Sequence, residues 1–333
     1  MHAIRLHTFG PAENLAYERT DDPVPGPGQV RVAVAAAGVH LLDTALREGM
    51  SGPFPAPTEL PTIPGREVAG RVESLGEGTD PGWLGRRVVA HIGTVPGGYA
   101  ELAVVDAEKL HPIPDALDEA AAVAMIGTGR TALGILQFTE LGPGSTVVVP
   151  AAAGGIGTLI VQYARNAGAT VIGLAGGSAK VAAVRANGAD LAVDYTLPDW
   201  DRQVHARLDG LGRRASVVYD SVGGTTGRAA VGLLGAGGQH IVFGWAGAGL
   251  HDGAPLTFTD EELAERGITS ENVLGPVMLA KAGGLRALET RSLAEAAVGR
   301  LRPAVQRFPL AEAAAAHRAL ETRGTMGKVV LIP

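Results

Sequence analysis

Cysteine is absent from the 333 residues of the chain. Its absence excludes disulfides, thiolate zinc sites, iron–sulfur clusters held by cysteine, and cysteine nucleophiles. A strong excess of one charge is also missing, because 28 Lys and Arg residues stand against 34 Asp and Glu residues, with no block of like charge. Nucleic-acid-binding domains usually carry a basic stripe. We therefore expect no nucleic acid among the partners.

The start of the sequence gives no targeting signal. Its first ten residues, MHAIRLHTFG, lack the apolar run of a secretory signal, which favours a cytoplasmic location. Two uncharged stretches, Leu141–Ala164 and Ala229–Leu250, are long enough to span a bilayer. Glycine clusters break both, and Pro150 interrupts the first, so we interpret each as a strand, a turn and part of a helix. We expect no membrane association.

Glycine is abundant, at 48 of 333 residues, about twice the usual ~7%. The length suggests two domains. Over roughly the first third of the chain, short β-type runs separated by Gly, Pro and Asp predict a small, irregular barrel. These runs are Val30–Val34, Val68–Val72, Arg87–His91 and Ala100–Val105. Five prolines make Ser51–Pro64 a loop.

The pattern changes near Asp118. Glu119–Phe138 is predicted as a helical segment that Gly127 and Gly129 interrupt. Strands then alternate with helices, which predicts a parallel sheet covered on both faces. The predicted strands are Thr146–Val149, Thr170–Leu174, Leu191–Val193, Ser216–Tyr219 and His240–Phe243, and the predicted helices are Gly155–Asn166, Ala179–Ala186, Trp200–Leu208 and Thr225–Leu234. A further helical stretch leads to a final strand, Lys328–Ile332.

The segment Val147–Ala164, VVVPAAAGGIGTLIVQYA, is the most informative part of the sequence. A buried strand ends at Pro150, a turn of small residues follows, and a helix begins. Ala152, Gly154 and Gly157 match a dinucleotide-binding fingerprint, in which small residues permit a tight turn, close approach to a pyrophosphate, and close packing of helix on strand. Amides at the helix N-terminus would then meet the phosphate charge. A glycine-rich turn in some other α/β fold is the alternative.

The end of the next strand indicates which nucleotide binds. NAD sites usually place an acidic residue about 20 residues beyond the glycines, but the six residues after Thr170–Leu174 are AGGSAK, without an acid. Ser178 and Lys180 could instead bind a ribose 2′-phosphate. One charge-assisted bond of ~1.5–3 kcal/mol would favour NADPH over NADH by roughly ten- to a hundredfold. Alternatively, Lys180 is a solvated residue early in a helix.

The sequence resembles the zinc-free quinone oxidoreductase branch of the medium-chain dehydrogenase/reductase superfamily, which includes zeta-crystallin. The matching stretches are Ala36–Gly49, Pro64–Gly76, Gly97–Val105, Pro150–Ala169, Val217–Gly224 and Glu321–Pro333. The resemblance implies a GroES-like irregular β-barrel catalytic domain, residues 1–120 completed by 272–333. It also implies a Rossmann domain with a doubly wound parallel sheet, residues 121–271, and a cleft between the two. The implied activity is NADPH-dependent reduction of a quinone or an enone, usually by a homodimer or a higher oligomer.

The resemblance also implies roles for individual residues. Asp43 and Thr131 would line the nicotinamide end, while Gly155 and Ile156 would meet the pyrophosphate. Further cofactor contacts would come from Gly176, Gly177, Ser178, Lys180 and Tyr195 at the adenosine phosphate, from Arg323 closing over it, and from Ser221, Phe243 and Gly244 at later strand ends.

We expect no metal. Zinc-dependent relatives carry Cys where His40 stands and His where Arg66 stands, beside Glu67. A catalytic zinc needs three protein ligands, and a guanidinium at a ligand position would repel the ion. His40 is then a packed or capping histidine, a hydrogen-bond donor to the substrate, or a proton source; together with Asp43 it is our candidate catalytic residue.

The chain also departs from the branch. Many members have Asn at His40, and several have Tyr at the positions of Ala45 and Ser51, which weakens the case for one particular enoyl mechanism. The hypothesis is hydride transfer from NADPH to a quinone or to the β-carbon of an α,β-unsaturated carbonyl, with water or His40 supplying the proton. An enoyl-thioester reductase of polyketide or lipid assembly and a non-catalytic NADPH-binding protein are the alternatives.

Overall fold

The computed structural model describes residues 1–50, 59–93, 96–248 and 253–333. Within these ranges the chain divides into two compact units. The first unit comprises Met1–Gly129, Glu289–Val298 and Pro303–Pro333, and the second comprises Arg130–Leu288 and Gly299–Arg302. The predicted loop Ser51–Pro64 falls largely outside the described residues, as does Ser51 itself.

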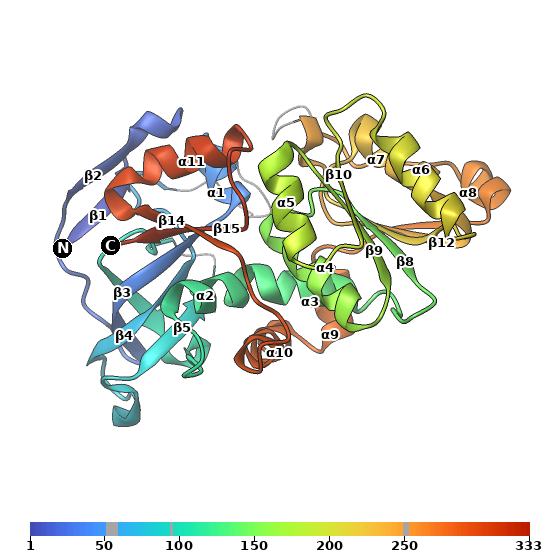
Figure 1. The fold of residues 1–333 in the computed structure, drawn as a ribbon. Coiled ribbons are helices and arrows are strands. Elements are labelled where there is room, and N and C mark those ends of the chain that lie inside the picture. The colour runs from blue at the N-terminus through green and yellow to red at the C-terminus, as the bar shows by residue number, and fades with distance from the viewer. Residues whose placement is uncertain (51–58, 94–95, 249–252) are drawn as a thin grey trace. The chain divides into compact units, whose positions relative to one another are not determined.

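The first unit is built mainly from antiparallel strands (Figure 1). Its larger sheet, as far as the structure describes it, has the order β14-β15-β3-β4-β5-β7, with β6 also pairing β3. A smaller sheet joins β1 and β2. The strands are β1 (His2–Leu6), β2 (Leu15–Arg19), β3 (Gln29–Val39), β4 (Glu67–Leu75), β5 (Arg87–His91), β6 (Leu102–Asp106), β7 (His111–Pro112), β14 (Val305–Pro309) and β15 (Lys328–Ile332).

Strand β3 runs five residues beyond the predicted Val30–Val34. In its first half, buried Val30, Val32 and Val34 alternate with more exposed residues, which is the period-two pattern that predicted it. The register shifts between Val34 and Ala36, and every residue from Ala36 to Val39 is buried. Because both faces are covered there, the sequence loses its alternation, and the prediction stopped too early.

The helices of the first unit include α1 (Leu41–Arg47), α2 (Glu119–Ala124) and α11 (Ala313–Glu321), while α10 (Leu285–Ala297) enters the unit at Glu289. The unit's apolar core lies between its strands and α11. It draws on β1, β3, β4, β5, β6, β15 and α11, for example through Ile4, Val32, Val88, Leu331 and Ala316. The barrel-like β domain predicted from the spacing of short strands is thus present.

The predicted helical segment Glu119–Phe138 divides at its glycines. Helix α2 is capped by the Asp118 carboxylate, which accepts from the amide of Ala121 at 2.7 Å. A π-helical turn, Met125–Gly129, follows, and α3 (Arg130–Leu136) continues. A Cβ on Gly127 would overlap the Glu67 carboxylate, and one on Gly129 would overlap the Ser292 hydroxyl. The glycines that weakened the helix signal are therefore places of close packing.

The second unit contains a parallel sheet with the order β10-β9-β8-β11-β12-β13 in the described part of the chain. Numbered from β8, this is the order 3-2-1-4-5-6 of a doubly wound dinucleotide-binding sheet. The strands are β8 (Thr146–Val149), β9 (Thr170–Ala175), β10 (Leu191–Asp194), β11 (Ala215–Asp220), β12 (Leu234–Val242) and β13 (Thr269–Asn272). Every residue of β8 is buried, because both of its faces are covered.

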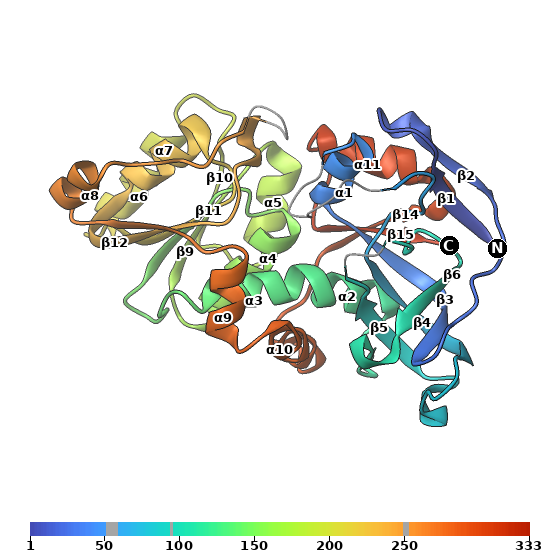
Figure 2. The same cartoon turned by 180° about the vertical axis from the view of Figure 1, so that it is seen from behind.

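Helices flank this sheet (Figures 1 and 2). Besides α3 they are α4 (Gly155–Asn166), α5 (Ser178–Ala186), α6 (Trp200–Gly210), α7 (Gly224–Gly232), α8 (Asp260–Arg266) and α9 (Pro276–Ala282). The stretch Leu141–Ala164 forms β8, a turn and most of α4, as its glycines and Pro150 predicted. No helix in the described ranges is long and apolar enough to cross a membrane.

Candidate active site

The glycine turn after β8 has the geometry that a phosphate loop needs. Gly154 is the N-cap of α4 and places no side chain over the first helical amides. A Cβ on Gly157 would lie 2.5 Å from the carbonyl oxygen of Ala151 and 2.8 Å from the Cα of Ala152. Only glycine therefore lets α4 approach the turn this closely. Gly155 and Ile156, in the first turn of α4, are half-exposed, so a pyrophosphate could reach their amides.

The residues predicted for the adenosine phosphate gather at the ends of β9 and β10. Gly177 has φ +87° and is the exposed N-cap of α5, which begins at Ser178 and carries Lys180 in its first turn. Tyr195 lies beside Gly176, since a Cβ there would be 3.6 Å from the tyrosine hydroxyl. The amide of Tyr195 also donates to the Ala175 carbonyl at 3.1 Å.

Sequence reasoning missed an acid at this end, Asp194, the last residue of β10. Its carboxylate accepts from the amide and hydroxyl of Thr196 at 3.0 and 2.6 Å. These bonds, with another from the amide of Gly177, lower the pKa of Asp194. The Asp194 carboxylate therefore hydrogen-bonds within the turn after β10 and to the N-cap of α5, and β10 lies beside β9. The parallel pairing of β9 and β10 was the signal that could have located it.

Two later strand ends lie at the edge of the sheet where the glycine turn stands, which is the proposed nucleotide edge. Ser221 follows β11, and Phe243 and Gly244 follow β12. A Cβ on Gly244 would lie 3.2 Å from the Ser221 carbonyl oxygen, so these predicted contacts are neighbours. Because β11 pairs with β8, they stand next to the glycine turn, at the switch point where dinucleotides bind in such sheets.

Two predicted residues lie apart from this group in the chain. Thr131 is half-buried in the first turn of α3, in the second unit. Arg323 follows α11 in the first unit, is exposed, and has an unusual positive φ of 56°. Their roles toward a nucleotide remain proposals.

In the first unit, His40 lies in a cluster of buried charges. Its Nε2 is 2.5 Å from Glu67 Oε1 and 2.7 Å from Lys328 Nζ. Lys328 Nζ is in turn 2.9 Å from Glu67 Oε2. Glu67 and Lys328 are buried, whereas 33% of the His40 side chain is exposed. Burial alone would raise the pKa of Glu67, but the nearby charges of His40 and Lys328 prevail and hold it well below the usual range.

Asp43 is held from several sides. Its carboxylate accepts from the His40 amide at 2.8 Å, the Tyr99 hydroxyl at 3.0 Å and the Arg66 guanidinium at 3.3 Å. Asp43 and His40 also form a capping box at the start of α1. Burial and the Asp43 charge raise the pKa of Tyr99 well above its usual value. We therefore propose that Asp43 acts by positioning His40 and α1.

Beside these residues lies His317, on α11. Its Nε2 is 3.3 Å from the Tyr99 hydroxyl, and burial lowers the pKa of His317 to about 4. The imidazole is therefore neutral near pH 7, and it ties α11 to the same network.

The side chains around His40 do not suit a catalytic zinc. A lysine ammonium already contacts both His40 and Glu67, and the Arg66 guanidinium pairs with Asp43. A divalent cation at this place would meet both positive groups. Among the described residues, no group of three or more His, Cys, Asp or Glu side chains is arranged to hold a metal ion.

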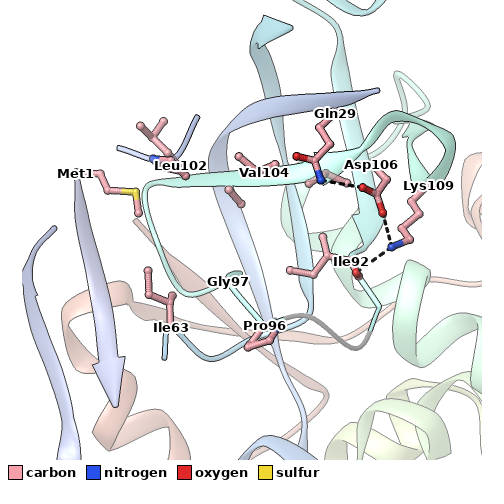
Figure 3. A pocket seen from close by; sticks show the side chains of 13 residues that line it. Met1, Gln29, Ile63, Ile92, Pro96, Gly97, Leu102, Val104, Asp106 and Lys109 are labelled. Atoms are coloured by element: carbon pink, nitrogen blue, oxygen red, sulfur yellow. Dashed lines mark hydrogen bonds and ion pairs between the residues drawn. The ribbon is translucent and has the colours of Figure 1, made fainter. Parts of the chain in front are cut away.

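A cavity of about 240 Å³ lies elsewhere in the first unit (Figure 3). Its lining is mainly apolar, including Ile63, Ile92 and Leu102. The polar groups on its wall bind one another: Gln29 donates to Asp106 at 3.0 Å, and Lys109 contacts Asp106 at 2.7 Å. None of the predicted site residues lines this cavity. It therefore adds nothing to the candidate site.

The structure also brings together Ser270, His240 and Asp220, which sequence reasoning did not connect. Ser270 Oγ is 2.8 Å from His240 Nδ1, and His240 Nε2 is 3.3 Å from Asp220 Oδ2. A hydrolase triad places the serine on Nε2 and the acid on Nδ1, the opposite arrangement. His240 and Asp220 also have no exposed surface, so a substrate cannot reach the imidazole. The three residues come from the adjacent strands β11, β12 and β13, and the pairing of these strands brings their side chains together.

The fold and the glycine turn together define a medium-chain dehydrogenase/reductase. Residues 26–115 match the alcohol dehydrogenase GroES-like domain, and residues 187–331 match the zinc-binding dehydrogenase family. The chain is 35% identical to a quinone oxidoreductase of Pseudomonas aeruginosa, with 99% of each chain covered. It is 33% identical to a 2-haloacrylate reductase of a Burkholderia species, over 99% of this chain and 98% of the relative.

Solved structures agree. The quinone oxidoreductase of Escherichia coli complexed with NADPH superposes with a TM-score of 0.81 at 28% identity, over the full length of both chains. The chain belongs to the zinc-free quinone oxidoreductase branch of the medium-chain dehydrogenase/reductase superfamily.

Proposed function

We propose that this protein is an NADPH-dependent reductase of quinones or α,β-unsaturated carbonyls. The proposal rests mainly on the glycine turn between β8 and α4. It is supported by the similarity of the chain, over its full length, to a quinone oxidoreductase. The haloacrylate in the second relative's name is itself a conjugated unsaturated acid. The first unit then provides the catalytic domain, and the second binds the nucleotide.

NADPH is the proposed cofactor. The turn Ala175–Lys180 after β9 offers a hydroxyl and a lysine where NAD-binding sites place an acid. The nearby acid, Asp194, accepts hydrogen bonds from Thr196. Charge-assisted bonds from Ser178 and Lys180 to a 2′-phosphate would favour NADPH.

The chemistry needs little from the protein beyond orientation and charge stabilisation. When bound, the nicotinamide supplies a hydride to the electron-poor acceptor. Negative charge then develops on the acceptor's oxygen, where a hydrogen-bond donor lowers the barrier. His40, partly exposed and next to the Lys328 ammonium, or water supplies the proton. Replacing His40 with Asn decides between them, because unchanged turnover would remove His40 from the mechanism.

A homodimer is proposed as the assembly. In the described part of the second unit, β13 ends the sheet and pairs with β12 alone. Edge strands present unpaired amides and carbonyls that a second copy can pair with. Light scattering on the eluted protein should give twice the chain mass, and Asn272→Pro, at a position whose amide faces away from β12, should lower it to one chain. A wild-type monomer at micromolar concentration would overturn the assembly proposal.

The decisive experiment mixes the purified protein with NADPH or NADH and follows cofactor oxidation with a panel of quinones and 2-enones. Faster oxidation of NADPH supports the proposal, and the better acceptor assigns the substrate class. Tight NADPH binding without turnover would instead point to a carrier-bound enoyl thioester or to a binding role. Absence of binding would overturn the proposal altogether.

A further inference from the structure

The turn after β11 is fixed by one buried carboxylate. Asp220 ends the strand, and its Oδ1 accepts from the amides of Val222 and Gly223 at 2.8 and 3.0 Å. Gly223 and Gly224, which follow Val222, both have a positive φ, of +64° and +58°. Such a turn has few alternatives when two successive amides share one acceptor. Asp220 therefore sets the path of the residues between β11 and α7.

The second oxygen of this carboxylate depends on His240. Oδ2 lies 3.3 Å from His240 Nε2, and His240 Nδ1 lies 2.8 Å from the Ser270 hydroxyl on β13. Helix α7 covers Oδ2 closely, because a Cβ on Gly227 would lie 2.5 Å from it. Both Asp220 and His240 have no exposed surface. His240 thus pairs with a carboxyl group that water cannot reach.

An aromatic side chain packs against His240. Phe258 packs edge-on against His240, with ring centroids 5.8 Å apart. The Arg228 guanidinium lies on Phe258, 4.9 Å from its centroid, and Glu262 is 3.9 Å from that guanidinium. The ring of Phe258 therefore separates the buried histidine from the exposed Arg228–Glu262 pair.

Main-chain pairing already aligns β11 with β12 and β12 with β13, and well-packed apolar residues often replace buried ionic groups without loss. What the carboxylate adds is the conformation of the turn that contains Ser221. The Ser221 carbonyl accepts from the amide of Ala246 at 3.1 Å and lies against Gly244. The fixed segment therefore belongs to the nucleotide edge of the sheet.

We propose that Asp220 and His240 are positioning residues for NADPH: through the Ser270–His240–Asp220 chain they preset the Ser221–Gly224 turn against which the cofactor binds. This rests on the proposed function. A preset turn saves the ordering cost of binding, so its loss should weaken the affinity for NADPH more than it slows turnover at saturating NADPH.

The test compares two buried histidines that each face a carboxylate. His240→Val removes the partner of Asp220, and His111→Val removes the partner of Glu289, which lies 3.1 Å away in the first unit. Both variants should melt at lower temperature. Fluorescence titration should show NADPH binding weakened about tenfold in H240V and unchanged in H111V. Wild-type affinity in H240V would overturn the inference.

Two double variants distinguish an effect on the turn from a general loss of stability, in case H240V folds poorly. D220N/H240V and D220A/H240V both lack the buried carboxyl group, but only Asn keeps an oxygen for the Val222 and Gly223 amides. D220N/H240V should bind NADPH several-fold more tightly than D220A/H240V. Equal affinities would overturn the inference. If the wild-type protein itself fails to bind NADPH, the proposed function falls as well.

Discussion

The ammonium of Lys328 lies 2.9 Å from the carboxylate of Glu67, and both side chains are buried. Removing either partner breaks a buried ion pair and leaves the other group in contact with the His40 imidazole, a loss of up to about 3–5 kcal/mol. We expect this loss in the free energy of unfolding for Glu67→Gln and for Lys328→Met, measured by urea titration. The double variant should lose less than the sum of the two. Additive losses would mean that the pair does not interact.

Gly127 lies against the same carboxylate. A methyl group there would overlap Glu67 Oε1, and the buried ion pair cannot move aside freely. Gly127→Ala should therefore lower the free energy of unfolding by about 1–3 kcal/mol or more, although Ala favours helices. Gly142→Ala is the control, because no atom lies within 4 Å of its added Cβ. A G127A variant as stable as G142A would contradict the packing described here.

Lys180 and Ser178 should determine the choice of nucleotide. Lys180→Ala should lower the ratio of kcat/KM for NADPH over NADH by roughly ten- to a hundredfold, as expected for one lost charge-assisted bond. Its effect on NADH alone should be small. Lys281→Ala is the matched control, since Lys281 lies on α9 over the Phe138 ring. An unchanged ratio in K180A would place the 2′-phosphate elsewhere.

The lowered pKa of His317 predicts that the protein loses stability in mild acid. This pKa is about 4 in the folded state and ordinarily near 6.5, so between these values the unfolded chain binds more protons. The free energy of unfolding should therefore fall as the pH drops from about 6.5 to 4, by up to about 3 kcal/mol. Urea titrations across this range should show a shallower fall in His317→Gln. Replacing exposed His7 should leave the slope unchanged.

The second unit was largely predictable because its signals are local. Apolar strands, glycine turns and helix starts follow one another in the chain, and a parallel order then places Ser221 beside the glycine turn. Strand β13 was missed because TSEN is short and polar. The His40–Glu67–Lys328 cluster was also missed, since Lys328 and His40 are 288 residues apart and no local pattern connects them. The same holds for Asp220 and His240, whose hydrogen bond depends on the register of neighbouring strands.

Strand β15 lies between β14 and β3 in the first unit. Strands from the end of the sequence, which are synthesised last, therefore complete a sheet whose other strands come mostly from its beginning. During translation, β8 to β13 leave the ribosome before β15 is synthesised. The nucleotide-binding unit can therefore fold while the catalytic unit still waits for its closing strand. Until then Glu67 has no ammonium beside it. A nascent chain should thus gain a nucleotide site before it gains a finished His40 environment, which delays any reductase activity until synthesis has passed Lys328.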